Sequence, residues 1–140
     1  YDSDIDKAKK LIKQIGLDSC KIDNDGDYFC TFRISDTRTQ GVMIYSKPIE
    51  AFGIARRRIS AVGYASGGPL SASDAAALLQ ANSTYNFGAW EVQQSGSKTM
   101  AVLASWIPVN ATTEQLTEIV ALVAMGADLI EAAKTGKDEY

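Results

Sequence analysis

The chain of 140 residues contains no histidine. This absence excludes Ser–His–Asp and Cys–His catalysis, histidine general bases and histidine-ligated zinc. The two cysteines cannot complete a four-ligand zinc site by themselves. We therefore expect a protein that is not an enzyme, with no catalytic residues, no metal centre and no cofactor.

Strong charge of one sign and long apolar runs are also missing. The net charge of -3 offers no basic surface of the kind that binds nucleic acid. No apolar segment approaches the roughly 20 residues that a membrane-spanning helix needs. We therefore expect neither nucleic acid nor a membrane as a partner.

The length suits a single domain over residues 1–140, and an apolar share of 46% is enough to build its core.

The first residue is Tyr1 and not methionine. A removed signal peptide explains this, and so does a shortened cytoplasmic chain. The sequence leaves the localisation open, with an exported, periplasmic protein slightly favoured over a cytoplasmic one by the placement of the two cysteines described below.

Hydrophobic periodicity predicts an α+β domain, in which three helices pack on an antiparallel sheet of about five to six strands. The expected helices cover residues 3–15, 71–82 and 112–135. The expected strands cover residues 20–22, 28–34, 40–46, 56–65, 87–93 and 99–107. Ser71 or Ser73 should cap the second helix, and Thr112 should form a capping box with Gln115 at the start of the third.

The segment KIDNDGDYFC, residues 21–30, places Asp23, Asp25 and Asp27 around Gly26. A calcium loop of the EF-hand type with this glycine at its sixth position would have lysine at the first position and phenylalanine at the twelfth, where oxygen ligands are required. The flanking residues alternate as strands do, and Asp-Gly between such strands is the strongest short signal for a hairpin. The pattern favours a turn with solvated carboxylates over a calcium site.

A three-residue loop over residues 24–26 would place Cys20 directly opposite Cys30. Opposed residues in an antiparallel pair have Cα atoms about 4.5 to 5.5 Å apart, within the range that a disulfide accepts. Two reduced, buried thiols explain the pattern equally well. The redox compartment decides between a disulfide and free thiols.

The segment ARRRIS contains three consecutive arginines. In a strand, Arg56 and Arg58 share one face and Arg57 takes the other. Such a cluster could hold an anionic ligand or an acidic segment of a partner. The pattern favours a solvated or edge strand whose charges discourage aggregation.

A second hairpin is expected in the later part of the chain, with a three-residue loop at 95–97. That register places Trp90 opposite Val102 on the core face. The opposite face would carry the apolar residues Phe87, Ala89, Leu103 and Ile107. Because this face is too apolar to stand open to water, we expect a helix or loop of the same chain, a second subunit or a bound peptide to cover it.

Three segments of the second half, GPLSASDAAALLQANS, FGAW and ADLIEAAKTGKDEY, resemble the YbjN family of bacterial proteins. Leu78, Leu79 and Asn82 are similar to the Leu-Leu-x-x-Asn helix end of that family, and residues 135–140 to its C-terminal tail. The resemblance implies a type III secretion chaperone-like fold, with helices packed on a curved antiparallel sheet. Chaperones of this fold are usually homodimers that bind extended segments of partner proteins, whereas YbjN proteins are described as regulators of sensory transduction without an established activity.

Three functional hypotheses follow. The first is a non-enzymatic, chaperone-like protein-binding or regulatory module that forms a homodimer and takes a protein or peptide segment. The residues expected to contact this partner are Phe87, Ala89, Leu103 and Ile107, with Arg56 and Arg58 at the rim. The second hypothesis is a binder of a small anionic ligand, or an enzyme, that uses the Arg56–Arg58 cluster. The third is a calcium-responsive protein that uses the three aspartates of residues 23–27.

Overall fold

The computed structural model describes residues 6, 9–10, 12–13, 20–136 and 139–140. Over these residues the chain forms one antiparallel sheet of seven strands and two long helices. The predicted α+β class is confirmed.

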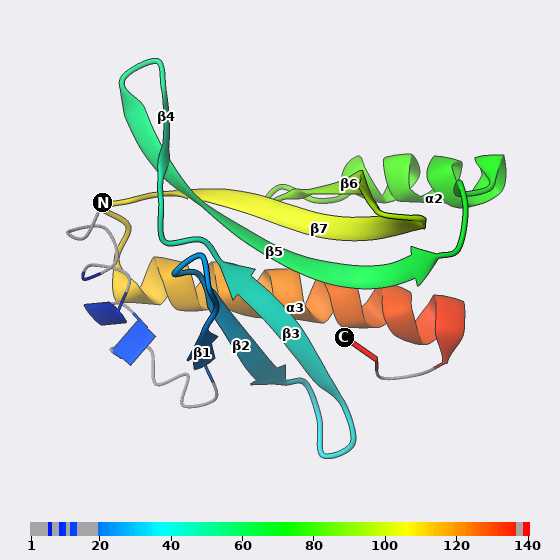
Figure 1. Ribbon diagram of the computed structural model, residues 1–140, viewed down its shortest axis with the longest axis horizontal. Helices are drawn as coiled ribbons and strands as arrows, with labels where there is room; N and C mark the ends of the chain where they lie inside the picture. Colours follow the sequence, from blue (N-terminus) through cyan, green and yellow to red (C-terminus); the bar gives the residue numbers. More distant parts are fainter. Residues whose placement is uncertain (1–5, 7–8, 11, 14–19, 137–138) are drawn as a thin grey trace.

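The strands lie between residues 20 and 108, and one helix separates the fifth strand from the sixth (Figure 1). They are β1 (Cys20–Ile22), β2 (Tyr28–Arg33), β3 (Thr39–Ile44), β4 (Ile49–Ala51), β5 (Ile54–Ser66), β6 (Ala89–Ser95) and β7 (Lys98–Pro108). Their order in the sheet is β1-β2-β3-β5-β7-β6, and β4 pairs with β5 outside this order. The expected count of five to six strands is wrong, because three residues of β4 are too few to show a periodic pattern.

The two described helices begin and end at the predicted signals. Helix α2 (Ala72–Asn82) starts after Ser71, whose hydroxyl accepts a hydrogen bond from a backbone amide of the first turn. Helix α3 (Thr113–Thr135) starts with the predicted capping box and ends before Gly136, which has a φ of 68°. Most of the expected first helix, residues 3–15, lies outside the described residues.

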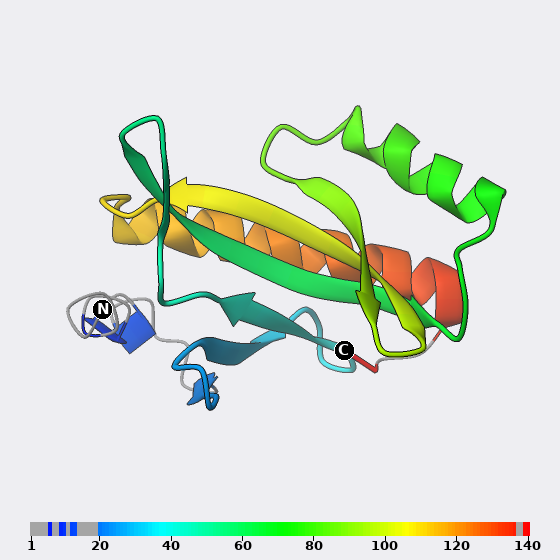
Figure 2. The same cartoon turned by 45° about the horizontal axis from the view of Figure 1, so that its top comes forward.

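Helix α3 covers one face of the sheet, along β3, β5 and β7 (Figures 1 and 2). Its buried apolar side chains are Leu116, Val120, Val123, Ala124 and Ala127. Burial of these residues against the strands supplies the main apolar core, at roughly 1.5 to 3 kcal/mol for each large aliphatic side chain. The opposite face of the sheet is not covered by either described helix.

Helix α2 lies beside the β6 edge of the sheet (Figure 2). The Asn82 side chain accepts a hydrogen bond from Trp90 N at 2.6 Å and donates one to Trp90 O at 3.3 Å. Leu78 is buried on this helix, and Lys134 of α3 contacts Asp74 of α2 at 2.7 Å. The asparagine at the helix end therefore joins α2 to the start of β6.

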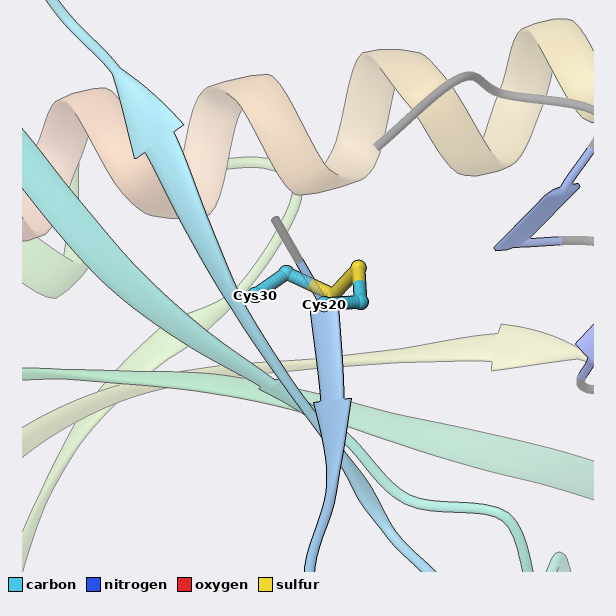
Figure 3. Close-up of a disulfide and its surroundings, with 2 residues drawn as sticks. All are labelled: Cys20 and Cys30. Carbon is cyan, nitrogen blue, oxygen red and sulfur yellow. A yellow bond between two sulfur atoms is a disulfide. The ribbon is translucent and has the colours of Figure 1, made fainter. Parts of the chain in front are cut away.

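The first hairpin has the predicted register. Cys20 lies opposite Cys30, and the loop between the strands contains Gly26 with a φ of 83°. The two sulfur atoms are bonded in the structure (Figure 3). Cys30 is fully buried, so this bond fastens the short edge strand β1 to the core.

The central pair of strands, β5 and β7, contains a bulge at Gly63. The register shifts between Val62 and Tyr64. A Cβ atom at Gly63 would lie 2.7 Å from the ring of Trp90, so glycine allows that ring to lie directly over the strand. Gly67, at the end of the same segment, has no atom within 4 Å of such a Cβ.

We expect Gly63→Ala to lower the free energy of unfolding by about 1 to 3 kcal/mol, because the Trp90 ring must move to admit the methyl group. Urea unfolding followed by tryptophan fluorescence measures this change. Gly67→Ala is the matched control and should leave stability within about 0.5 kcal/mol of the parent. Equal effects of the two substitutions would contradict the packing described here.

We expect the chain purified without reductant to have an intact mass two hydrogens below that of the reduced chain, because Cys20 and Cys30 are bonded. Replacing both cysteines with alanine should lower the free energy of unfolding by about 3 kcal/mol, since the bond closes a loop of about ten residues in the unfolded chain. Reductant should destabilise the parent and leave the double variant unchanged. A parent whose stability does not respond to reductant would contradict this expectation.

Candidate functional site

The register of the second hairpin differs from the expected one. Ser95 pairs with Lys98, so the loop has two residues and not three, and Gly96 in it has a φ of 63°. Trp90 consequently lies opposite Leu103 and not Val102. A shift of one residue turns every side chain of β7 to the other face of the sheet.

Of the four apolar residues expected on one face, three lie together on the core side of the sheet and Ala89 does not. Leu103 and Ile107 are buried in the core, and the side chain of Leu103 packs against Gly126 of α3. Phe87 is partly buried against the same core, whereas Ala89 is exposed. The core side of the sheet, packed on α3, covers Phe87, Leu103 and Ile107, which is the expected cover by a helix of the same chain. These residues therefore do not form an open binding face.

The side of the sheet that neither described helix covers, here called the open face, carries a different set of apolar residues. They are Phe29, Met43, Val62, Met100, Val102 and Trp106. Phe29 is 44% exposed and Trp106 is 39% exposed, whereas Val102 is buried between its neighbours and the other three are half-buried. Figure 1 looks onto this face, with α3 behind the strands.

The three consecutive arginines occupy three different environments. Arg57 is 2% exposed, and its guanidinium donates hydrogen bonds to the backbone carbonyls of Tyr45 and Ser46. Arg56 is exposed beside Ile49 at the edge of the open face. The expected division of the arginines between the two faces is confirmed, but Arg57 serves the fold by holding the chain that leaves β3.

Arg58 lies on the open face within a group of aromatic and acidic side chains. Its Nη1 atom contacts Glu91 Oε1 at 2.5 Å. Its guanidinium carbon lies 5.9 Å from the centre of the Tyr45 ring and 5.7 Å from that of Trp106. The hydrogen bond from Arg58 holds the pKa of the Glu91 carboxyl below its usual value, together with the positive charge of Arg58 and against partial burial.

The turn that contains Asp23, Asp25 and Asp27 is held by hydrogen bonds between its own side chains and backbone and to the chain after β3. The carboxylate oxygens of Asp23, Asp25 and Asp27 lie within 4.8 Å of one another. Asp23 Oδ1 accepts hydrogen bonds from the backbone amides of residues 25 and 27, each at 2.9 Å. Asp27 Oδ1 accepts one from Ser46 N at 2.9 Å, so this turn fastens the connection between β3 and β4.

Strand β4 and the start of β5 form a hairpin that projects beyond the rest of the sheet (Figures 1 and 2). We call this hairpin the arm. Three large apolar side chains on it are exposed: Ile49 by 56%, Phe52 by 101% and Ile54 by 54%. A recess of about 300 Å³ at its base is lined by Ile49, Ala51, Arg56 and Trp106.

The arm was missed by sequence reasoning. The signal was present in the segment IEAFGIA, where Phe-Gly separates two short apolar stretches. In the structure Ala51 pairs with Ile54 around a two-residue turn, and both turn residues, Phe52 and Gly53, have positive φ. This is the pattern of a type I′ turn, in which asparagine is the usual first residue.

Sequence reasoning also missed two buried carboxylates on α3. Asp128 is 6% exposed, and Arg38 Nε contacts its Oδ1 at 3.0 Å. Glu131 is fully buried, and Arg38 Nη2 contacts its Oε1 at 3.5 Å. Two acidic residues three positions apart on the apolar side of an amphipathic helix were the available signal.

Comparisons with family models, with curated proteins and with solved structures found no match to this chain. Among the described residues, no helix has both the length and the hydropathy that crossing a bilayer requires.

We expect Arg58→Gln to raise the pKa of the Glu91 carboxyl toward its ordinary value, because the hydrogen bond and the positive charge of Arg58 are what lower it. Carbon-detected NMR titration of the side-chain carboxyl measures the change. The contribution of this pair to stability is present above the pKa of Glu91 in the unfolded chain and is lost as the pH falls through its lower pKa in the folded state. Arg56→Gln is the control, and an equal rise of the pKa in that variant would contradict the assignment.

Proposed function

We propose that this chain is a non-enzymatic protein-binding module that works as a homodimer, and that the contact is made by the arm and the adjoining part of the open face. The residues of this contact surface are Ile49, Phe52, Ile54 and Trp106, with Arg56 and Arg58 at its rim. Leu103 and Ile107 are buried in the core and are not part of this contact surface.

The main evidence for this contact surface is the backbone conformation of Phe52 and the exposure of its side chain. Its side chain is fully exposed, so the folded chain gains nothing from its burial. Its φ of 54° lies in the left-handed region, which costs an ordinary residue about 1 to 2 kcal/mol. A large aromatic side chain that costs stability in the free chain is typical of a residue whose burial occurs in a complex.

The shape of the arm favours a protein partner over a small ligand. Small-molecule sites are concave, whereas the arm is a projection with apolar side chains at its tip. The rim carries positive charge at Arg56, while the whole chain has a net charge of -3. The exposed charge of Arg56 at the base of the arm is available to an acidic group of the partner copy.

The resemblance to the YbjN family gives this proposal its biological context. An α+β domain with helices on one face of an antiparallel sheet is what that resemblance implies. We propose a chaperone-like or regulatory role on the same basis, as an analogy of fold and sequence segments.

The alternative of a small anionic-ligand site on the arginine cluster receives no support from the contacts. Arg57 is turned into the fold toward backbone carbonyls. Arg58 is already paired with the carboxylate of Glu91. The three guanidiniums do not converge on a common cavity, as anion recognition by several arginines requires.

We expect Phe52→Asn to weaken self-association at least about tenfold while leaving the free energy of unfolding unchanged or raising it by up to about 1 kcal/mol. Asparagine tolerates the left-handed conformation and suits the first position of this turn, but it removes the apolar contact. Light scattering over a concentration series and urea unfolding measure the two effects.

Leu79→Asn is the matched control, because Leu79 is 70% exposed on α2, away from the arm. It should leave the dimer unaffected. A parent chain that stays monomeric at about 0.5 mM, equivalent to an association weaker than roughly 5 kcal/mol, would overturn the proposed homodimer. An equal loss of association in both variants would show that the arm is not the interface.

A further inference from the structure

The sheet opens between β3 and β5. These two strands pair only at Met43–Ser60 and Ile44–Ile59. Beyond those pairs they diverge into a V-shaped opening, with α3 behind it (Figure 1). Among the described residues, no strand pairs with β5 on this edge past Ser60. The backbone edges of two strands therefore face one another across the opening.

Gln40 spans the narrow part of the opening. Its Nε2 atom donates to Val62 O on β5 at 3.0 Å and to Gly41 O at 3.2 Å. The side chain is fully buried, and within the described part of the chain its Oε1 atom has no hydrogen-bond partner. A buried acceptor without a donor costs free energy, so a backbone amide brought into the opening would stabilise Gln40 by donating to this atom.

Residues 139 and 140 occupy the opening in this structure. Gly41 N donates a hydrogen bond to Tyr140 O at 3.0 Å, a contact of the kind that joins neighbouring strands. Glu139 N and Tyr140 N both donate to Glu131 Oε2, at 2.8 and 3.1 Å. Figure 1 shows this end of the chain between β3 and β5. The opening therefore accepts the backbone of an extended segment.

The contacts to this segment involve its main chain. Glu131 is fully buried, and its carboxylate is stabilised by Arg38 on one oxygen and by two backbone amides on the other. Every residue except proline supplies such an amide. Recognition at this point therefore depends on extended backbone and not on one particular side chain.

Space for a side chain lies next to the bound segment. A cleft of about 280 Å³ adjoins residues 139 and 140. Its other lining residues are Phe29, Thr31, Thr39, Gly41 and Val62. The Phe29 ring lies directly over Gly41, where any Cβ atom would collide with it. The cleft is thus bordered by an aromatic ring and threonines, which suit a side chain of mixed polarity.

We propose that the opening between β3 and β5 is a binding site for an extended segment of a partner protein, and that residues 139 and 140 occupy it until such a segment displaces them. The partner would add between the two strands, using the amide of Gly41 and the carboxylate of Glu131. The inference shares with the proposed function only the idea that the partner is a protein. The opening and the arm are separate surfaces and are tested separately.

The experiment compares two double variants of the full chain. Glu139→Pro with Tyr140→Pro removes both amide donors to Glu131, whereas Glu139→Ala with Tyr140→Ala keeps them. The probe is a fluorescent peptide with the sequence of residues 135–140, TGKDEY, amidated at its end. Fluorescence anisotropy measures its affinity for the parent and for both variants.

We expect the proline variant to bind the peptide at least about tenfold more tightly than the alanine variant or the parent, because its own segment no longer competes for the opening. The same peptide with proline at both of its last positions should not bind. Hydrogen exchange at the Gly41 amide gives a second readout: it should be faster in the proline variant and slow again when the TGKDEY peptide is added.

Equal affinities of the proline and alanine variants, or unchanged exchange at Gly41, would overturn the inference. The outcome is independent of the arm. Peptide binding by a chain that stays monomeric would support the opening and contradict the proposed homodimer. A dimer that depends on Phe52, together with no peptide binding in the proline variant, would support the proposed homodimer and contradict the binding site in the opening.

Discussion

The pairing of β5 with β7 is the interaction on which the other elements depend. β5 runs over Ile54–Ser66 and is the one strand that also pairs with β3 and β4. Backbone hydrogen bonds along this pair set the two faces of the sheet, and α3 packs on one of them. Because the described helices cover a single face, the register of the central pair decides which apolar side chains reach the core and which meet solvent.

Both candidate sites arise where β5 leaves its neighbours. At its start, β5 extends past the end of β7 and pairs with β4, which produces the arm. Further along, the strand separates from β3 after Ser60, and this produces the opening that residues 139 and 140 occupy. A long strand that exceeds its partners leaves unpaired backbone and exposed side chains at its ends, and these are the features that other proteins can use.

Buried charged residues hold the irregular backbone beside these sites. Arg57 binds the carbonyls of residues 45 and 46 where the chain turns toward the arm. Glu131 receives the amides of residues 139 and 140, and Arg38 joins it to Asp128. Each charge is stabilised by hydrogen bonds that compensate for the loss of water. The same contacts satisfy backbone groups that the sheet and helices leave without partners.

The sequence by itself determined the local elements, because caps, turns and apolar periodicity act over a few residues. It determined the α+β class, the ends of α2 and α3, and the register of Cys20 with Cys30, where face parity and Asp-Gly agreed. The two-residue turn at Gly96 and Ser97 is also a local signal, although a three-residue loop was expected there. Only the tertiary structure decided that Leu103 and Ile107 are buried in the core. It also decided the exposure of Phe52 and the burial of Glu131, since both depend on how distant segments meet and not on neighbours in the chain.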